Sequence, residues 1–329
     1  MENSTHPEVP AEWTAALAQH AVSTTVRLRD NILGVYQGPE RVVDLLVATV
    51  IAGGHILLEG VPGVAKTTLA STLAQSIEGH FRRIQFTPDL LPGDITGTNI
   101  LNMRTSEFEF RAGPVFAHVV MADEINRAPA KTQSALLEAM QEGSVTVEGD
   151  TYALPSPFIV IATQNPVEHE GVYPLPEAQL DRFMMRILIE YPSLEQELRM
   201  LSLRTSARPE ASVVIHAQDL LQLRHIASLV QVSPVMQRYI TELTRATRRH
   251  ASVRLGASPR ASLALMLAAR ARALMVGRDY VHVDDVRDVV VPVLAHRLIL
   301  HAGAMMNGTT AVEVVDRIVR DVRYDKAAG

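Results

Sequence analysis

The sequence predicts an α/β domain built on a parallel sheet, followed by a smaller all-helical domain. Residues 55–58 form a short apolar run that leads into a loop at Gly60, and a helical pattern starts at Lys66. Residues 158–162 are apolar without interruption, which is typical of a parallel strand covered on both faces. After residue 191, strand signals become rare and long helical patterns follow.

Hydrophobic runs and periodicity predict the elements of the α/β part in order. Strands of the sheet are expected at residues 55–58, 81–86, 115–121, 158–162 and 185–189, and helices at 14–30, 41–51, 66–77 and 131–142. Residues 87–113 are rich in proline and glycine and are expected to be irregular, except for one hairpin arm at 108–111. A second hairpin is expected around Gly149.

The C-terminal part is expected to be helical at residues 194–206, 217–230, 233–249, 259–276, 283–300 and 310–324. We therefore expect three segments. These are an N-terminal helical extension (1–30), an α/β core (31–191) and a helical domain (192–329).

Bulk properties exclude several classes of protein. At roughly 100–200 residues per domain, 329 residues suggest about two domains. The net charge of −5 argues against general affinity for nucleic acid, and the absence of cysteine excludes disulfides and thiolate metal sites. The most apolar stretch, 45–58, is too short to cross a bilayer, and no signal peptide is recognised at the N-terminus. A cytoplasmic protein without membrane insertion is expected.

The loop after the first strand has the pattern of a phosphate-binding loop, or P-loop. Its expected nucleotide-binding residues are Gly60, Val61, Pro62, Gly63, Val64, Ala65, Lys66, Thr67 and Thr68. Backbone N–H groups and the positive end of the next helix would hold the phosphates of ATP. Lys66 would contact the β- and γ-phosphates, and the Thr67 hydroxyl would bind Mg²⁺. The alternative is a chance glycine-rich turn.

One residue departs from the usual P-loop pattern, which has glycine immediately before the lysine. Here that position is Ala65. The departure is mild if the residue has right-handed helical dihedral angles, which alanine tolerates well.

A second site element follows the apolar residues 119–122, where Asp123 and Glu124 stand at the expected end of a strand. Asp123 would hold Mg²⁺ through the water shell of the ion, and Glu124 would orient or deprotonate the attacking water. A solvated acidic loop is the alternative. A third element is Asn165, whose amide at the end of another strand could bind the γ-phosphate or the water, although Asn-Pro is also a turn signal.

With these elements together, the chain resembles the AAA+ ATPases, and among them the MoxR family. The resemblance covers most of residues 54–183 and includes Phe86-Thr87-Pro88-Asp89-Leu90-Leu91-Pro92, Ala122-Asp123-Glu124-Ile125-Asn126-Arg127, Ala162-Thr163-Gln164-Asn165-Pro166 and Pro174-Leu175-Pro176-Glu177-Ala178-Gln179-Leu180-Asp181-Arg182-Phe183. The C-terminal part matches chiefly at Gly256-Ala257-Ser258-Pro259-Arg260-Ala261.

The resemblance implies a P-loop αβα core with a parallel sheet and a helical lid, with ATP bound between them. It assigns Walker A to Lys66 and Thr67, Walker B to Asp123 and Glu124, sensor 1 to Asn165, the arginine finger to Arg182 and sensor 2 to Arg260. It also implies a ring, commonly of six subunits, in which Arg182 reaches the γ-phosphate of the neighbour. Simple alternatives are a salt bridge for Arg182 and a solvent-facing helix start for Arg260.

The family resemblance also implies a protein partner. Residues 87–113 resemble the insertion of the helix-2-insert branch, where Phe108 and Phe110 either contact a partner or pack a small hairpin. MoxR proteins are regarded as chaperone-like ATPases that act with von Willebrand factor A domain proteins. We therefore expect an Mg²⁺-dependent ATPase that remodels or activates a protein partner.

Three alternatives remain at this point. A magnesium chelatase-type subunit has the same core, although the sequence around Asn165 and Glu177 favours the MoxR family. A scaffold that binds ATP without hydrolysis is opposed by intact Glu124, Asn165 and Arg182. A DNA-processing AAA+ protein is suggested by an arginine run in the lid, which consists of Arg245, Arg248, Arg249, Arg254 and Arg260. Such a run is usually a solvated face, and the acidic net charge argues against nucleic acid.

Overall fold

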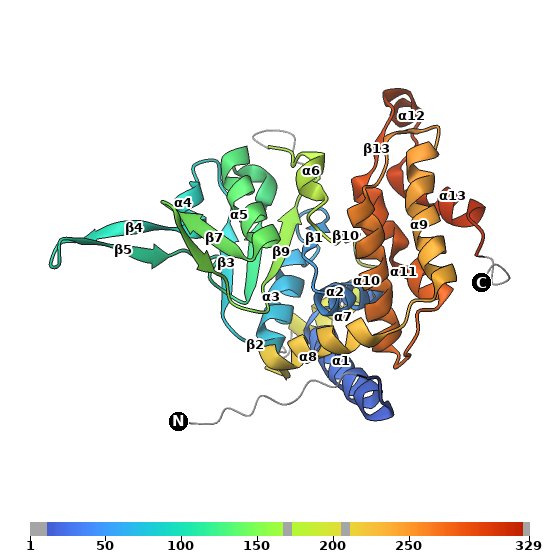
Figure 1. Cartoon of the computed structure of the whole chain (residues 1–329), viewed down its shortest axis with the longest axis horizontal. Coiled ribbons are helices and arrows are strands. Elements are labelled where there is room, and N and C mark those ends of the chain that lie inside the picture. Colours follow the sequence, from blue (N-terminus) through green and yellow to red (C-terminus); the bar gives the residue numbers. More distant parts are fainter. Residues whose placement is uncertain (1–11, 167–172, 205–210, 325–329) are drawn as a thin grey trace.

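A five-stranded parallel sheet forms the centre of the α/β part (Figure 1). The computed structural model of the chain describes residues 12–166, 173–204 and 211–324. The strands lie in the order β10-β1-β9-β6-β3, and each neighbouring pair is parallel. Their bounds are β1 Ile56–Glu59, β3 Phe81–Gln85, β6 Val119–Asp123, β9 Ile159–Gln164 and β10 Met185–Leu188. The α/β fold with a parallel sheet is thus confirmed.

One predicted strand starts four residues later than expected. Val115 and Ala117 are fully buried, yet β6 begins only at Val119, because residues 115–118 form turns and bends. Their side chains belong to the core beside β6 and α5. The apolar residues at 115–118 belong to a buried loop. Hydrophobic periodicity in the sequence does not distinguish such a loop from a strand.

Helices cover both faces of the sheet. On one face, Leu57, Val120 and Val160 pack in a cluster with Leu136 and Leu137 of α5. On the other face, the alternate residues of the same strands pack with α2 and α3. This two-sided burial explains why the central strands are apolar at every position. The helices of the α/β part are α1 Ala15–Val35, α2 Glu40–Ile51, α3 Lys66–Ser76, α4 Pro92–Thr96, α5 Ala130–Glu142 and α6 Glu177–Leu180, with a 3₁₀ turn, η1, at Ile125–Arg127.

Two hairpins extend this part. The first consists of β4 (Gly97–Asn102) and β5 (Glu107–Ala112) and projects far from the body in Figure 1. The second consists of β7 (Ser144–Val147) and β8 (Asp150–Ala153), as predicted around Gly149. Phe110 stacks on Tyr152 at 3.9 Å between ring centroids, so the base of the first hairpin rests on the second.

The C-terminal part is a bundle of helices beside the edge strand β10 (Figure 1). Its helices are α7 Leu194–Arg204, α8 Ala217–Leu229, α9 Pro234–Arg249, α10 Pro259–Met275, α11 Val283–Leu294, α12 Ala302–Met306 and α13 Ala311–Asp321. The short extended pieces are β2 Ile77–Glu78, β11 Ile215–His216, β12 Val253–Leu255 and β13 Ile299–Leu300, and β2 pairs with β11, which joins the two parts of the chain. The expected end of the first lid helix at residue 206 lies outside the described residues.

The helix predicted at 283–300 is shorter in the structure. It ends at Leu294, and residues 295–297 form a 3₁₀ turn, η2, before β13. In this turn Arg297 and His296 are buried and bond the backbone of the segment around residue 182. These tertiary contacts override the helical pattern of the sequence. The division of the chain at residues 30 and 191 stays a prediction.

Candidate nucleotide site

The P-loop lies between β1 and α3, as predicted. Gly60 has no room for a side chain, because a Cβ there would lie 2.5 Å from the carbonyl oxygen of Ile189. Gly63 has φ +86°, a left-handed conformation in which glycine alone avoids strain. The two glycines therefore shape the loop for different reasons, close approach at one and backbone conformation at the other.

The expectation for Ala65 is wrong in its premise. Ala65 has φ +62° and ψ +26°, which is left-handed and not right-handed helical. The residue precedes the first turn of α3, where the chain must turn from the loop into the helix axis. A left-handed alanine costs roughly 1–2 kcal/mol relative to a right-handed one. The loop therefore carries strain that glycine would relieve.

Lys66 connects the P-loop to the end of β9. Its ammonium group donates hydrogen bonds to the carbonyl oxygen of Gly60 and, at 3.0 Å, to that of Gln164. Asn165 follows Gln164 directly and is almost fully buried. The structure thus brings Lys66 and Asn165 to the same edge of the sheet, where the carboxyl ends of β1 and β9 lie side by side.

Asp123 ends β6 at this same edge, and both of its oxygens have partners. Arg83 of β3 donates to Oδ2 at 2.5 Å, and Thr163 of β9 donates to Oδ1 at 2.5 Å. The register explains the contacts, because Asp123 stands opposite Gln85, and Arg83 lies two residues earlier on the same strand. A carboxylate that is almost fully buried is stabilised by such charge-assisted hydrogen bonds.

Glu124 leaves the strand with φ +56°, a second left-handed residue in the site. Its backbone N–H donates to Thr163 Oγ1 at 2.9 Å, and its carboxylate oxygen Oε2 accepts from Gln85 Nε2 at 2.9 Å. Arg127 Nε lies 3.0 Å from the same oxygen. The side chain is therefore held at the edge of the sheet beside the end of β3. Sequence reasoning missed Arg83 and Gln85. The sequence places them in a predicted strand, but it does not show that this strand lies beside β6.

The donor set at this edge fits Mg²⁺. The Thr67 hydroxyl at the start of α3 and the Asp123 carboxylate at the end of β6 are hard oxygen ligands of the kind that Mg²⁺ prefers, and α3 packs beside β6. Because both Asp123 oxygens already accept hydrogen bonds, a contact through water suits the residue better than direct coordination. Among the described residues there is no group of three or more His, Cys, Asp or Glu side chains that could hold a metal ion.

Arg182 lies at the edge of the sheet formed by the amino ends of the strands, whereas the P-loop lies at the opposite edge, formed by their carboxyl ends. It comes just before β10, which is parallel to β1, and the N–H of Met184 donates to the carbonyl of His55 at the start of β1. The P-loop follows the other end of β1, roughly 13 Å away along a four-residue strand. Arg182 Nε donates to Gln141 Oε1 at 3.2 Å, near the end of α5. The structure therefore does not bring Arg182 to Lys66 within one chain.

Arg260 lies at the same edge as Arg182. Ser258, two residues earlier, donates its hydroxyl to Asp181 Oδ2 at 3.2 Å. Burial, with a smaller contribution from the charge of Arg260, lowers the pKa of Arg297, which forms an ion pair of 2.8 Å with Asp181. The predicted nucleotide residue Arg260 thus stands beside the arginine finger candidate and not beside the P-loop of its own chain.

Arg297 fixes the segment that carries Arg182. Its guanidinium donates to the carbonyl oxygens of Asp181 and Phe183, at 3.2 and 2.9 Å, and His296 Nε2 contacts the same Phe183 oxygen at 3.1 Å. Burial lowers the pKa of Arg297 to about 10, against the opposing effect of Asp181. The lid therefore holds the backbone on both sides of Arg182. A lone Arg in a helical pattern gave no sequence signal for this role.

A small pocket adjoins the P-loop. It is lined by Tyr36, Gln37, Gly38, Pro39, Gly63, Val64, Ala65, Ile189, Glu190 and Pro192. Burial raises the pKa of Tyr36 to about 12. Among the described residues no group forms a hydrogen bond with the Tyr36 hydroxyl. A buried hydroxyl without a partner beside a phosphate loop is suited to a polar ligand atom.

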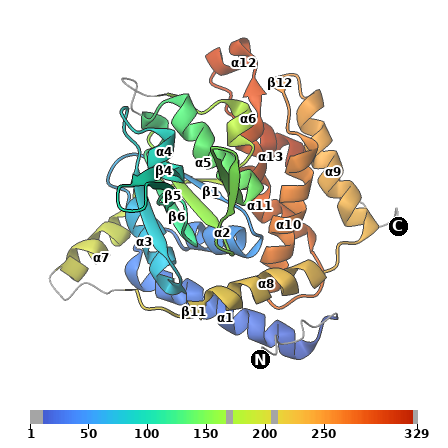
Figure 2. The same ribbon diagram turned by 60° about the vertical axis from the view of Figure 1, so that its left-hand side comes forward.

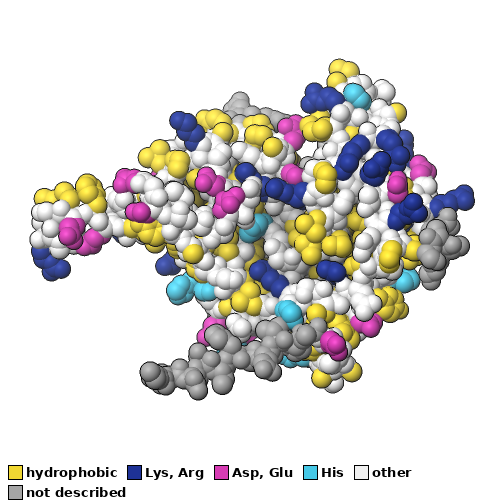
Figure 3. Space-filling model, viewed as in Figure 1, with side chains coloured by type: hydrophobic (Ala, Val, Ile, Leu, Met, Phe, Trp, Pro, Cys, Tyr) yellow, Lys and Arg dark blue, Asp and Glu magenta, His cyan; other side chains and the backbone are white. Residues whose placement is uncertain are grey.

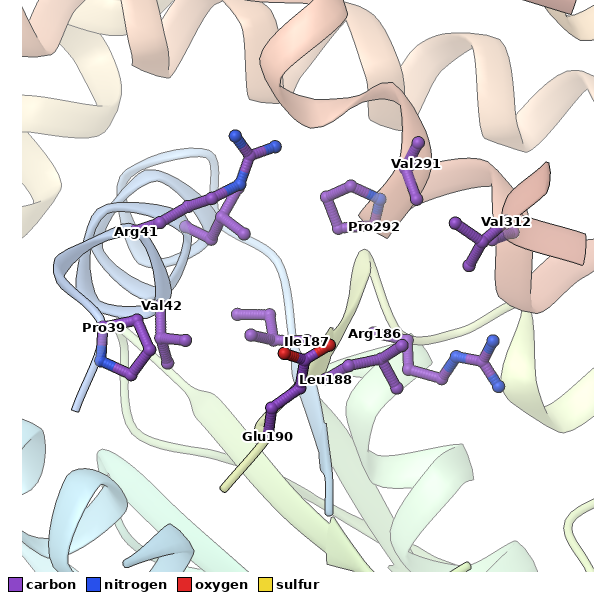
Figure 4. A pocket seen from close by; sticks show the side chains of 12 residues that line it. Pro39, Arg41, Val42, Arg186, Ile187, Leu188, Glu190, Val291, Pro292 and Val312 are labelled. Atoms are coloured by element: carbon purple, nitrogen blue, oxygen red, sulfur yellow. The ribbon is translucent and has the colours of Figure 1, made fainter. Parts of the chain in front are cut away.

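A larger cavity of about 310 Å³ continues from this pocket through Pro39 and Glu190 (Figure 4). Pro39, Arg41 and Val42 line one side, and Val291 and Pro292 of α11 line the opposite side. Glu190 points into the space between them. The cavity therefore lies at the junction of the α/β part and the helical part, next to the P-loop.

Comparisons with known proteins identify the family of the chain. Residues 55–185 match the model of the ATPase family associated with various cellular activities (AAA), and residues 245–318 match the AAA lid domain. Chaperone MoxR1 of Mycobacterium tuberculosis is 44% identical to the chain over 324 residues, which cover 96% of this chain and 86% of that protein. The chain belongs to the MoxR family of AAA+ ATPases.

Two further relatives support this membership. Protein MoxR of Paracoccus denitrificans is 33% identical over 81% of this chain and 86% of its own length. A crystal structure of a protein from Cytophaga hutchinsonii superposes with a TM-score of 0.87 and 41% identity, covering 94% of this chain and 98% of that one. The α/β core followed by a helical lid is therefore the fold of this MoxR-family chain.

Proposed function

We propose that this MoxR-family protein hydrolyses ATP, with Mg²⁺, in a site completed by a neighbouring subunit of a ring. The observation that carries the proposal is the separation of two sets of residues. Lys66, Asp123, Glu124 and Asn165 gather at one edge of the sheet, whereas Arg182 lies at the opposite edge. A head-to-tail arrangement of identical chains would place the second edge of one subunit against the first edge of the next.

In this proposal, each residue at the first edge has its own role in binding or hydrolysis. The P-loop N–H groups and Lys66 bind the phosphates, which requires Lys66 to leave the carbonyls that it contacts now. Glu124 and Asn165 orient the attacking water. Thr67, and Asp123 through water, would hold Mg²⁺, which would supply positive charge to the phosphate oxygens. Arg83 and Thr163 hold the Asp123 side chain in place.

The second edge supplies cations to the neighbour. Arg182 of one subunit would stabilise the charge of the transition state in the site of the next, an effect of roughly 10³–10⁵ in rate for arginine fingers. Arg260 would approach the same phosphates from the start of α10. Hydrolysis would then depend on assembly, and we propose six subunits, as is common among AAA+ proteins.

Subunit mixing tests the shared site. Arg182→Ala and Glu124→Gln rings are each expected to lose at least 10³-fold in ATP turnover. In mixed rings, an Arg182→Ala subunit keeps its own Glu124 and receives Arg182 from a Glu124→Gln neighbour, so turnover should return to a fraction of the wild-type rate. Arg27→Ala, an exposed arginine of α1, is the matched control. Two inactive variants that stay inactive when mixed would contradict a shared site.

Nucleotide binding by the P-loop has its own test. Lys66→Ala is expected to abolish binding of a fluorescent ATP analogue, because the loop loses the charge that neutralises the phosphates. Arg27→Ala again serves as the control for loss of one cation. Normal ATP affinity in Lys66→Ala would refute the assignment of the loop.

We further propose that turnover drives remodelling or activation of a protein partner in the cytoplasm. The name of the relative Chaperone MoxR1 and the projecting β4–β5 hairpin support this role, and a protein with a von Willebrand factor A domain is the proposed partner. A Glu124→Gln form locked with ATP should retain such a partner, whereas Lys66→Ala should not. Equal retention by both would show that the contact is independent of the ATP cycle.

No helix among the described residues is long and apolar enough to span a membrane.

A further inference from the structure

Helix α7 (Leu194–Arg204) carries an exposed row of leucines. Leu194, Leu198 and Leu201 are 73%, 54% and 64% exposed. Their spacing of four and three residues places them on one side of the helix, and we refer to these three residues as the leucine face. Figure 2 shows α7 standing off the side of the molecule. A helix in a globular protein normally turns such a stripe toward a core, so this one indicates an interface.

The leucine face starts at the rim of the nucleotide site. β10 ends at Leu188, and the carbonyl of Ile189 lies against Gly60. Pro192 lines the pocket beside the P-loop, two residues before α7 begins. The leucine face is therefore continuous with the edge of the molecule that lacks Arg182. Any subunit that brings its Arg182 to this P-loop must come close to α7.

The edge that carries Arg182 also exposes apolar side chains. Leu255 of β12 is 54% exposed and Leu263 of α10 is 52% exposed. They flank Ser258 and Arg260, and Ser258 bonds Asp181, which adjoins Arg182. We refer to a set of exposed leucines and arginines on this side as the arginine edge. Its members are Leu255, Leu263, Arg245, Arg248, Arg249, Arg254 and Arg260. Figure 3 shows basic side chains gathered over the lid, on the right of that view.

Charge distinguishes the two surfaces. The arginine edge is basic, and the ends of the lid helix α9 and of β12 add to it. On α7, the first turn is acidic and contains Glu195 and Glu197, both exposed beside the leucine face. Opposite charges around apolar anchors are the arrangement of protein interfaces, in which charge sets orientation and approach, and apolar side chains supply affinity.

We propose that the leucine face of α7 is the docking surface for the arginine edge of a second copy of this chain. The proposal rests on the shared site proposed above and names the surfaces that assemble it. Contact between these two different surfaces is head-to-tail, so it leaves one unused surface at each end of a pair and closes only in a ring. The arginine run of the lid then serves subunit contact and not nucleic acid.

Charge insertion into the leucine face tests the proposal. Leu198→Glu is expected to weaken association in ATP by about 30-fold or more, because a leucine anchor is lost and a carboxylate is buried in its place. Sedimentation velocity with ATP should show monomers at concentrations where the wild type assembles. The fluorescent ATP analogue should bind as in wild type, and the unfolding temperature should stay the same, since the side chain is exposed. Leu194→Glu should act in the same way, and Val276→Glu, also exposed but on the far end of α10, should not.

Mixing two defective variants tests the head-to-tail geometry. Leu198→Glu keeps an intact arginine edge, and Leu263→Glu keeps an intact leucine face. Each alone should be monomeric and lose turnover, whereas an equimolar mixture should form dimers and no larger species. Those dimers should regain part of the ATP turnover, because the site of the Leu263→Glu subunit receives Arg182 from its partner.

The outcomes separate this proposal from the shared site itself. If mixing Arg182→Ala with Glu124→Gln restores no turnover, the shared site fails and the docking proposal fails with it. If that mixture regains turnover but Leu198→Glu and Leu194→Glu assemble and hydrolyse normally, the shared site stands and the leucine face belongs to another partner. Failure of the mixture of Leu198→Glu and Leu263→Glu to form dimers would overturn the pairing with the arginine edge.

Discussion

Two residues of the nucleotide site hold left-handed backbone angles without being glycine. Ala65 precedes the helix that begins at Lys66, and Glu124 follows the strand that ends at Asp123. Each such residue costs of order 1–3 kcal/mol and persists only where the surroundings fix it. At Glu124 the fixing contacts are the Thr163 hydroxyl and the Gln85 amide. At the residue scale, two of the four described non-glycine residues with positive φ therefore lie where phosphate chemistry is proposed, and the other two, Ser106 and Glu148, lie in hairpin turns.

Ala65→Gly measures that strain directly. Glycine removes the roughly 1–2 kcal/mol of left-handed strain but adds about 0.5–1 kcal/mol of backbone entropy to lose on folding. We expect the free energy of unfolding to rise by up to about 1 kcal/mol, as measured by chemical denaturation. The matched control is Ala18→Gly inside α1, where the backbone is right-handed and glycine should cost about 1 kcal/mol. Equal destabilisation by both substitutions would contradict the left-handed conformation.

The sequence predicts only part of the site at this scale. Lys66, Asp123 and Asn165 each follow an apolar strand, and parallel strands end at one edge, so their proximity follows from local patterns. The pairing of Arg83 with Asp123 depends on the register of β3 against β6, which the sequence does not specify by itself. The dihedral angle of Ala65 is likewise set by the entry into α3.

At the element scale, two phenylalanines of the hairpin strand β5 have different surroundings. Phe110 stacks on Tyr152 and contacts Phe116 edge-on, with ring centroids 5.6 Å apart, whereas Phe108 is 72% exposed. Of the two readings left open by the sequence, packing holds for Phe110 and exposure for Phe108. The two residues lie two positions apart on β5 and therefore on the same face, so alternation along the strand does not distinguish them. Phe110 lies nearer the base of the hairpin, where Tyr152 and Phe116 contact it.

Hydrogen exchange at the hairpin tests this difference. Phe110→Ala should remove about 1–2 kcal/mol of local stability, because aromatic contacts and burial are lost together, and amide exchange in β4 and β5 should rise about tenfold or more. Phe108→Ala serves as the matched control and should change exchange by less than about twofold. Comparable acceleration in both variants would show that the hairpin is not anchored through Phe110.

The limits of the helical pattern also appear at this scale. Residues 283–300 have one continuous apolar periodicity, yet α11 stops at Leu294. The turn that follows exists because Arg297 and His296 bond the backbone around Arg182, a segment more than 110 residues earlier. Contacts between distant parts of the chain leave no local periodicity, so they could not be predicted from it.

At the scale of the whole molecule, the fold sorts the functional residues onto two edges. The succession of the main strands and helices along the chain was predictable, because each has its own pattern, but α4 and β4 lie where the sequence was expected to be irregular. The place of the lid was not, since it depends on contacts such as Ser258 with Asp181 that join remote segments. As a result, Arg260 lies beside Arg182 and not over the P-loop of the same chain. The division into two edges is what makes a second copy necessary in the proposed function.

Two histidines, the partly buried His55 and the buried His296, also connect distant parts of the molecule. His55 accepts a hydrogen bond from the N–H of Val160 and donates one to the carbonyl of Met140, so it joins β1, β9 and α5 in its neutral form. Burial lowers the pKa of His55 from 6.5 to about 4. Burial also lowers the pKa of His296, with a further contribution from the charge of Arg297. Both residues therefore resist protonation in the folded chain.

Acid should consequently destabilise the fold in a defined range. The folded pKa of His55 lies below the unfolded value, so between pH 6.5 and pH 4 the unfolded chain binds the proton more readily. The stability is fully present above pH 6.5 and is lost as the pH falls to about 4, by roughly 3 kcal/mol for this residue at 1.36 kcal/mol per pKa unit. Denaturation midpoints measured from pH 7.5 to 4 should fall more steeply in wild type than in His55→Gln, which cannot titrate. His20→Gln, on the exposed side of α1, should keep the wild-type slope. If His55→Gln kept the wild-type slope as well, the acid sensitivity would have to arise elsewhere than at the junction of β1, β9 and α5.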